Sequence, residues 1–277
     1  MTEYKLLAMD VDDTLLDKEL RLHPADQAAI ARARAAGVQV VLATGRMYRA
    51  TLPLARRLGI TAPLITYQGA YIRHPLTDEE IWHCPVPLNL ALEVLELNRQ
   101  WGFHVNAYFD DNIYVAEQTE HSLRYQAISG VAAIPVGDLS AFLRRAGRDL
   151  TKVLLIAPEK ELDAVLPLCR RHFGDRLHIT KSKPFFLEFS HPQANKGEAL
   201  ARLCDRLGLS LAQAIAVGDS YNDLEMLEMA GLGVAVGNAR EEVKARADYV
   251  TAPVEEGGVA RVIEKFIFAE SKDNFSG

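Results

Sequence analysis

The sequence predicts an α/β protein whose parallel-sheet core is interrupted by an inserted α+β domain. Three observations lead to this prediction. Short apolar runs alternate with helical patterns over residues 6–66. Over residues 84–188 the pattern changes to short strands with hairpin turns. The alternation of helix and strand then resumes after residue 196. We therefore expect a core built from residues 1–83 and 189–277, with residues 84–188 as the insertion.

The first part of the chain is expected to form a β-α-β-α-β unit. Residues 6–9 are an apolar run that stops at acidic residues, as a buried central strand would. Pro24 suits the first turn of a helix and Gly37 suits the position after its end, so we expect a helix over residues 24–36. The pattern continues with a strand over 38–43, a helix over 48–58 and a strand over 63–66.

The insertion is predicted from turn residues and short apolar segments. Asp110-Asp111-Asn112 is typical of a turn, and it separates strands expected at 103–108 and 113–115. Helices are expected at 88–100 and 159–171. The resumed core is expected to contain a helix over 196–207, a strand over 214–217, a helix over 224–229 and a strand over 233–236. Residues 269–277 are expected to form a frayed tail.

Composition narrows the class of protein. Hydrophobic residues make up 49% of the chain and charged residues 25%, which is typical of a globular protein rather than a disordered one. A formal net charge of −6 argues against nucleic-acid or anionic-membrane partners, which require basic patches. The three cysteines are widely spaced, which suggests neither a disulfide framework nor a zinc site and fits the cytoplasm. We find no signal peptide and no apolar stretch of membrane-spanning length.

Acidic residues follow two of the predicted core strands, at the sheet edge where α/β proteins bind ligands. Asp10 and Asp12 follow the first strand, and Asp219 and Asp223 follow the strand over 214–217. Neighbouring carboxylates repel unless a cation, a proton or hydrogen bonds offset their charge. A Mg²⁺ ion takes a few such oxygen ligands. The sequence thus indicates Mg²⁺ or a shared proton, with helix capping as the alternative.

Two further segments suit an anionic ligand. Thr44-Gly45-Arg46 follows a predicted strand, where a hydroxyl and free backbone amides at a helix start can hold phosphate oxygens. The alternative for Thr44 is a plain helix cap. Lys196 opens a helix, and its charge opposes the helix macrodipole there, so its presence favours an anionic partner. The alternative for Lys196 is a solvated surface lysine.

In this order, the four segments resemble the signature motifs of the haloacid dehalogenase-like hydrolase superfamily. They are Asp10-Val11-Asp12-Asp13-Thr14, Thr44-Gly45-Arg46, Lys196-Gly197 and Gly218-Asp219-Ser220-Tyr221-Asn222-Asp223. The long insertion falls between the second and third motifs, as in the Cof-type subfamily. The resemblance implies a Rossmann-like parallel-sheet core with a C2-type cap domain. Where this chain has Gln68-Gly69-Ala70, the family often has Asn-Gly-Ala; both side chains are amides, so we expect a small change.

The resemblance also implies a Mg²⁺-dependent phosphatase, a phosphoric monoester hydrolase, for a small metabolite such as a sugar phosphate or cofactor phosphate. Asp10 would be the nucleophile that forms an aspartyl-phosphate. Asp12 would protonate the leaving alcohol and then activate water. The implied phosphate- or substrate-binding residues are Thr44, Gly45, Arg46, Lys196 and Asn222. The implied metal ligands are Asp10, Asp12 through its carbonyl, and Asp219, with Asp223 and Asn222 as direct or outer-shell support.

Three other functions remain open on this sequence. A dehalogenase of the superfamily needs no divalent cation, which would leave the clustered acids unbalanced. A phosphomutase commonly has its cap between the first two motifs, where this chain has a short gap. A non-catalytic phosphometabolite-binding regulator could use the same fold, although the intact set of motif residues favours an enzyme. The expected assembly is a monomer or homodimer.

Overall fold

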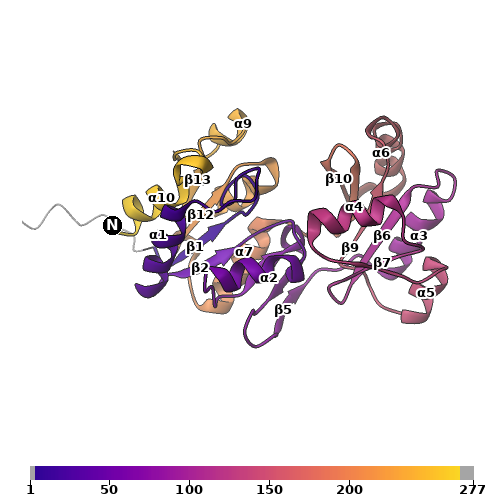
Figure 1. The fold of residues 1–277 in the computed structure, drawn as a ribbon, viewed down its shortest axis with the longest axis horizontal. Coiled ribbons are helices and arrows are strands. Elements are labelled where there is room, and N and C mark those ends of the chain that lie inside the picture. The colour runs from indigo at the N-terminus through magenta and orange to yellow at the C-terminus, as the bar shows by residue number, and fades with distance from the viewer. Residues whose placement is uncertain (1–3, 269–277) are drawn as a thin grey trace, which may run out of the picture. The chain divides into compact units, whose positions relative to one another are not determined.

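The computed structural model describes residues 4–268 and divides into two compact units. The first contains the chain up to Gly45, Leu52–Glu80 and the chain from Asn195 onwards. The second contains Arg46–Thr51 and Ile81–Ala194. The predicted fold class, a parallel-sheet core with an α+β insertion, is confirmed (Figure 1). The predicted frayed tail lies outside the described residues.

The first unit is built on a parallel sheet with the strand order β14-β13-β12-β1-β2. Strand β1 pairs with β12 on one side and β2 on the other, and its four side chains are fully buried. A central strand covered on both faces carries apolar residues without alternation, which is the pattern seen in the sequence. The strands are β1 (Leu6–Met9), β2 (Gln39–Leu42), β12 (Ala214–Gly218), β13 (Leu232–Ala235) and β14 (Tyr249–Val250).

Helices flank this sheet, and α1 packs beside α10 (Figure 1). Helix α7 has the predicted bounds because Asn195 caps its start, accepting a hydrogen bond from the Glu198 amide at 2.8 Å, and Gly208 ends it in the left-handed conformation. The first turn of α2 groups with the second unit. The helices are α1 (Pro24–Ala35), α2 (Tyr48–Arg57), α7 (Lys196–Leu207), α8 (Leu224–Met229), α9 (Glu241–Lys244) and α10 (Gly258–Phe266).

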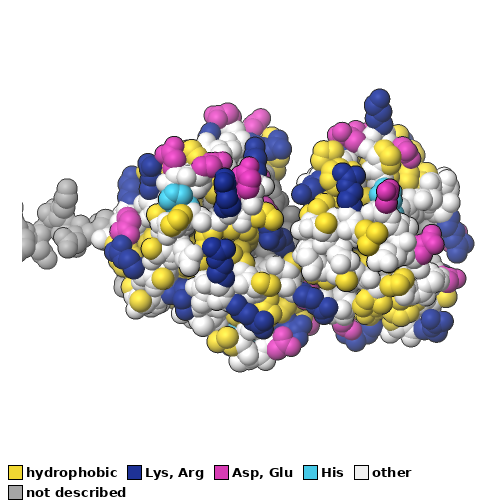
Figure 2. All heavy atoms as spheres, viewed as in Figure 1, with side chains coloured by type: hydrophobic (Ala, Val, Ile, Leu, Met, Phe, Trp, Pro, Cys, Tyr) yellow, Lys and Arg dark blue, Asp and Glu magenta, His cyan; other side chains and the backbone are white. Residues whose placement is uncertain are grey.

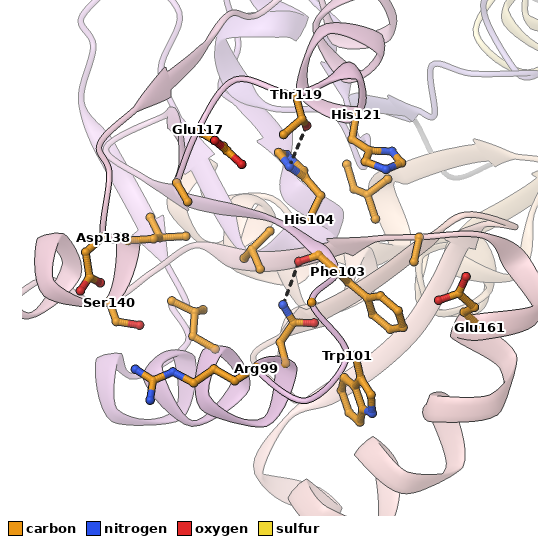
Figure 3. A pocket seen from close by; sticks show the side chains of 18 of the residues that line it. Arg99, Trp101, Phe103, His104, Glu117, Thr119, His121, Asp138, Ser140 and Glu161 are labelled. Atoms are coloured by element: carbon orange, nitrogen blue, oxygen red, sulfur yellow. Dashed lines mark hydrogen bonds between the residues drawn. The ribbon is translucent and has the colours of Figure 1, made fainter.

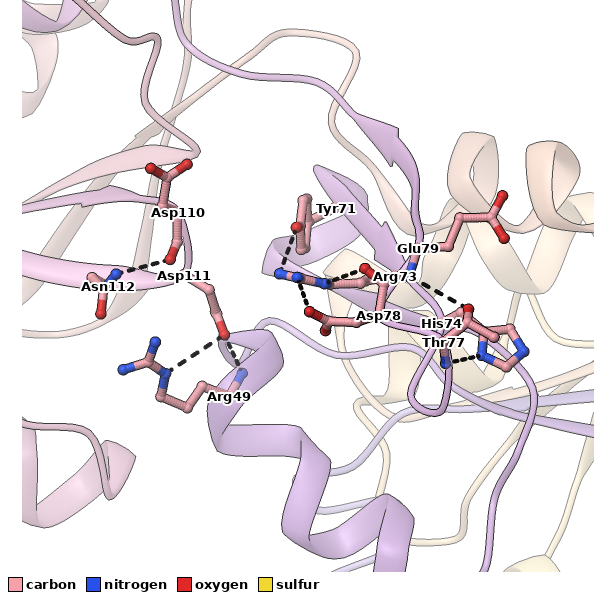
Figure 4. A network of polar contacts seen from close by, with 10 residues as sticks. All are labelled: Arg49, Tyr71, Arg73, His74, Thr77, Asp78, Glu79, Asp110, Asp111 and Asn112. Carbon is pink, nitrogen blue, oxygen red and sulfur yellow. Dashed lines mark hydrogen bonds and ion pairs between the residues drawn. The ribbon is translucent and has the colours of Figure 1, made fainter. Parts of the chain in front are cut away.

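A small antiparallel sheet continues the chain after β2. It contains β3 (Leu64–Thr66), β4 (Tyr71–Arg73) and β5 (Glu80–His83), and a parallel bridge joins Ala43 to Ile65. In the β4–β5 hairpin, the Arg73 guanidinium donates to the Tyr71 hydroxyl at 3.2 Å and to the Asp78 carbonyl at 3.1 Å (Figure 4). These bonds fix the hairpin loop.

The second unit is an α+β domain with a six-stranded sheet in the order β10-β11-β9-β6-β7-β8. Alternate residues of its strands, such as Ala107 and Phe109, join a buried apolar cluster with residues of α3, α5 and α6. The strands are β6 (His104–Phe109), β7 (Asn112–Val115), β8 (Ala133–Pro135), β9 (Lys152–Ile156), β10 (His178–Lys183) and β11 (Phe186–Ser190). The helices are α3 (Leu88–Asn98), α4 (Glu120–Ser129), α5 (Leu139–Ala146) and α6 (Glu159–Phe173).

The predicted turn between β6 and β7 is present. Asp110 and Asp111 both have positive φ, at 48° and 54°, as the two central residues of a tight hairpin require. The buried Asp111 carboxylate accepts a hydrogen bond from the backbone N–H of Arg49 at 2.8 Å (Figure 4). Asp111 therefore satisfies a donor in the first turn of α2 that the helix itself leaves unpaired.

The surface carries both signs of charge. On the face drawn in Figure 2, Lys and Arg side chains are interspersed with Asp and Glu side chains. Among residues 4–268, no helix combines the length and apolar character needed to cross a bilayer.

Candidate active site

Three acidic side chains converge at the carboxyl ends of β1 and β12. Asp10, Asp219 and Asp223 are buried, and each offers a carboxylate oxygen within 4.8 Å of the others. The Asp10 amide donates to the Val217 carbonyl at 2.9 Å, so the β1–β12 pairing runs directly into the site. Parallel pairing of adjacent strands thus brings together acids that lie more than 200 positions apart in the chain.

Lys196 lies between two of these acids. Its Nζ is 2.6 Å from Asp10 Oδ1 and 2.6 Å from Asp223 Oδ1, and its side chain is fully buried. Burial opposes the charge of Lys196, but the carboxylates of Asp10 and Asp223 outweigh it and raise its pKa, so the ammonium is retained. The alternative of a solvated surface lysine is therefore wrong, and the lysine at this helix start has anionic partners.

The carboxylates carry more charge than the lysine offsets. Burial raises the pKa of Asp10 well above its usual value, Lys196 opposes this shift, and Asp223 and Asp219 add to it. Burial, with repulsion from Asp223, raises the pKa of Asp219 to about 6. When ionised, three carboxylates exceed one ammonium by two charges, which is the charge of one divalent cation. An oxygen-only donor set of this kind fits Mg²⁺.

Hydrogen bonds fix the orientation of the two acids that follow β12. Asp223 Oδ2 accepts from the backbone amides of Asp219 and Ser220, each at 3.0 Å. Asp219 accepts from the Ser220 hydroxyl at 2.7 Å and from the Thr14 hydroxyl at 3.2 Å. A Cβ on Gly218 would lie 2.5 Å from Asp223 Cβ, so only glycine fits before this loop. Such outer contacts commonly set the orientation of metal-binding carboxylates.

Backbone hydrogen bonds hold the loop after β2. Thr44 is fully buried, its backbone N–H donates to the Ile65 carbonyl at 2.9 Å, and its carbonyl accepts from the backbone N–H of Gln68 at 3.1 Å. Tyr67 and Gln68 have positive φ, at 52° and 59°. For a residue other than glycine this conformation costs about 1–2 kcal/mol, and such strain concentrates at functional sites.

Comparison with known proteins identifies the family of this chain. A sequence profile described as haloacid dehalogenase-like hydrolase matches residues 7–263. The chain belongs to this family. The structure of a haloacid dehalogenase-like hydrolase from Bacteroides thetaiotaomicron superposes with a TM-score of 0.87 at 28% identity, covering 95% of this chain and 99% of that one. The resemblance drawn from the motifs, including the Cof-type grouping, is confirmed.

Two curated relatives from this family carry named activities. A 5-amino-6-(5-phospho-D-ribitylamino)uracil phosphatase of Bacillus subtilis is 31% identical, over 96% of this chain and 98% of that protein. A pyridoxal phosphate phosphatase of Escherichia coli is 30% identical, over 94% of this chain and 97% of that protein. The predicted enzyme class, a phosphatase of the haloacid dehalogenase-like type, is confirmed.

Other family motif residues lie around the buried cluster. Asp12 is exposed, two residues beyond Asp10, and Asn222 is exposed beside Asp223. Asn222 Nδ2 donates to Gln68 Oε1 at 2.9 Å, which links it to the loop that holds Thr44. Gly45 lies against the same Gln68 side chain. The half-buried Arg46 groups with the second unit, so its place in the substrate site stays a prediction.

Sequence reasoning missed three residues that hold the acidic loops. Thr14 and Ser220 lie inside the quoted motifs, and a hydroxyl beside an acid was the available signal. Asn238 donates from Nδ2 to the Asp13 carbonyl at 2.6 Å, and Asp13 has a positive φ of 59°. No sequence pattern connects Asn238 to Asp13, because their contact depends on the placement of the loop after β13.

The second unit contains a cavity of about 700 Å³. Trp101 and Phe103 line it with stacked rings whose centroids are 5.8 Å apart, and a His104 ring nitrogen is hydrogen-bonded to the Thr119 hydroxyl at 3.0 Å. These side chains are labelled in Figure 3. None of the predicted catalytic or metal-binding residues lines this cavity. Tyr108 is fully buried in the same unit.

Proposed function

We propose that this chain is a Mg²⁺-dependent phosphatase that hydrolyses a small phosphorylated metabolite through an aspartyl-phosphate on Asp10. The observation that carries the proposal is the buried cluster of Asp10, Asp219 and Asp223 around Lys196, with its excess of two negative charges. The named activities of the two relatives support a sugar-alcohol phosphate or a cofactor phosphate as the substrate class.

Asp10 suits the role of nucleophile. Lys196 binds Asp10 Oδ1 at 2.6 Å, which orients the carboxylate and favours its ionised form. Asp10 Oδ2 then attacks phosphorus, and the bond between phosphorus and the alcohol oxygen breaks. Asp12, two residues further and exposed, donates a proton to that oxygen as the alcohol leaves.

The second half of the reaction restores the enzyme. Asp12 takes a proton from a water molecule, whose oxygen attacks the phosphorus of the aspartyl-phosphate. The bond between phosphorus and Asp10 breaks, inorganic phosphate is released and the Asp10 carboxylate is regenerated. Thr44 and Gly45 hold the phosphoryl oxygens together with Lys196, and Arg46 and Asn222 complete the substrate site.

The acidic residues of the site fit a resident Mg²⁺ ion. Asp10, Asp219, Asp223 and the Asp12 carbonyl would hold it, and when bound it supplies positive charge that offsets the negative charge of the phosphoryl group. Asp223 also bonds Lys196 and two backbone amides, so one of its roles is to position the lysine.

We further propose that residues 84–188 are a cap domain that selects the substrate. We also propose that the protein acts in the cytoplasm as a monomer or homodimer. An α+β unit inserted between the second and third motifs supports this role, because binding loops on a separate unit can change without disturbing the reaction centre.

The test combines turnover with trapping of the intermediate. Purified protein is assayed on a panel of phosphorylated metabolites with Mg²⁺ and with excess chelator, and Asp10→Asn is compared with the wild type. We expect turnover only with Mg²⁺, an acyl-phosphate in acid-quenched wild type, and loss of both in the variant. Full turnover in chelator would refute the dependence on Mg²⁺, and binding of phosphometabolites without hydrolysis would favour the regulator.

A further inference from the structure

Gln68 lies among three segments that carry the predicted site residues. Its backbone N–H donates to the Thr44 carbonyl at 3.1 Å, and its Oε1 accepts from Asn222 Nδ2 at 2.9 Å. The next residue, Gly69, approaches α7 so closely that a Cβ there would lie 2.1 Å from the Asn195 carbonyl oxygen. The segment 67–69 therefore contacts the loop after β2, the loop after β12 and the start of α7.

The side chain of Gln68 lies directly over Gly45. A Cβ on Gly45 would be 2.3 Å from Gln68 Nε2 and 2.8 Å from Gln68 Cδ, and the three nearest atoms all belong to that side chain. Gly45 does not have the left-handed φ that favours glycine. We therefore attribute the glycine at position 45 to the passage of the Gln68 side chain.

The backbone of this segment is strained in a way that the contacts explain. Tyr67, Gln68 and Gly69 have successive positive φ values of 52°, 59° and 93°. Side-chain-bearing residues keep this conformation only where surrounding structure holds them. The left-handed turn allows the backbone N–H of Gln68 to reach the loop after β2 while its side chain reaches the loop after β12.

We propose that Gln68 is a positioning residue, which bridges to Asn222 across Gly45 and so fixes the Thr44-Gly45 loop relative to the Asp219–Asp223 loop. The inference rests on the proposed function, in which the first loop holds the phosphoryl oxygens and the second holds the metal. The transition state is bound by both loops at once, so their separation affects the rate of phosphoryl transfer. Asn222 adjoins Asp223, which bonds Lys196 at 2.6 Å, so the bridge also reaches the lysine.

Two single variants break the bridge from opposite sides. Gln68→Ala removes the amide, and Gly45→Ala introduces a Cβ that displaces it. We expect each to lower kcat about 10- to 100-fold, because small errors in position act on the transition state, with little change in KM. The double variant should be no slower than Gln68→Ala, because the side-chain amide that the added methyl group overlaps is then absent. Gln27→Ala, an exposed glutamine on α1, is the matched control and should keep wild-type kcat.

A reciprocal exchange tests the bridge itself. Gln68→Asn shortens the bridge by one methylene and should lower kcat, whereas adding Asn222→Gln restores the total length and should recover most of the loss. A merely structural role for Gln68 would change thermal stability without this recovery. Each variant is therefore also measured for its Tm and for the Kd of inorganic phosphate by calorimetry.

The outcomes separate the two proposals. If the wild type turns over but Gln68→Ala keeps kcat within about twofold, the bridge has no positioning role and the inference is wrong. It is equally wrong if the effects of Gly45→Ala and Gln68→Ala multiply in the double variant. If the wild type neither hydrolyses phosphate monoesters nor binds inorganic phosphate, the proposed function fails and the inference falls with it.

Discussion

Replacement of Lys196 by methionine tests the central electrostatic argument. The substitution keeps an unbranched side chain of similar size but removes the ammonium, which leaves Asp10 and Asp223 buried without a cation. Removing one partner of a buried ion pair costs about 3–5 kcal/mol. Lys196 bonds two carboxylates at 2.6 Å with no exposed surface, so we expect the upper part of this range in a chelator.

The assay is urea unfolding followed by circular dichroism, in chelator and in Mg²⁺. Adding Asp10→Asn to Lys196→Met removes one of the stranded charges, so the double variant should be more stable than Lys196→Met alone. Mg²⁺ should recover part of the loss in the single variant, because it replaces positive charge at the same acids. A loss below about 1 kcal/mol, or an additive double variant, would refute the proposed charge balance.

Three further predictions follow from the same structure. Mg²⁺ at about 100 times its Kd should raise the unfolding free energy of the wild type by about 2.7 kcal/mol; Asp219→Asn should lose most of this shift in thermal scans, and an unchanged shift would exclude Asp219 as a ligand. Gly218→Ala should destabilise the protein by about 1–3 kcal/mol through overlap with Asp223 and weaken Mg²⁺ binding; wild-type values for both in calorimetry and urea unfolding would contradict the packing argument. Burial raises the pKa of Asp26 to about 6, so the folded state keeps a proton that the unfolded state loses from about pH 4. The free energy of unfolding should therefore fall by up to about 3 kcal/mol as the pH rises to 6. Asp26→Asn should flatten this slope in urea titrations, and an identical slope would rule out Asp26 as its source.

The sequence was most informative for elements whose position in the fold determines their residue types. The apolar strand β1 and the capped helix α7 were predicted because burial on both faces requires apolar residues and helix ends favour particular capping residues. The convergence of Asp10 with Asp219 followed from a general rule, since parallel strands present their carboxyl ends at one edge of the sheet.

Helices with weak patterns were missed. In α4 the only buried residue is Ser122, so no apolar stripe marks the helix, and a Thr119–Ser122 capping box starts it instead. Helix α5 was recognisable in principle from Asp138 at its start and Gly147 after its end. The Gln68–Asn222 bond could not be predicted, because it joins residues 154 positions apart through a left-handed turn that non-glycine residues rarely adopt.

The buried cluster of charged side chains lies within the first unit. Asp10, Lys196, Asp219 and Asp223 all belong to the first unit, and their mutual contacts require no residue of the second. The proposed nucleophile, the lysine and the proposed metal ligands can therefore stay fixed while the inserted unit changes its sequence. In the proposed function these groups contact only a phosphoryl group and a cation, so they cannot distinguish one phosphate ester from another. Discrimination among metabolites must then come from residues outside this cluster, which is where the proposed role of the cap places it.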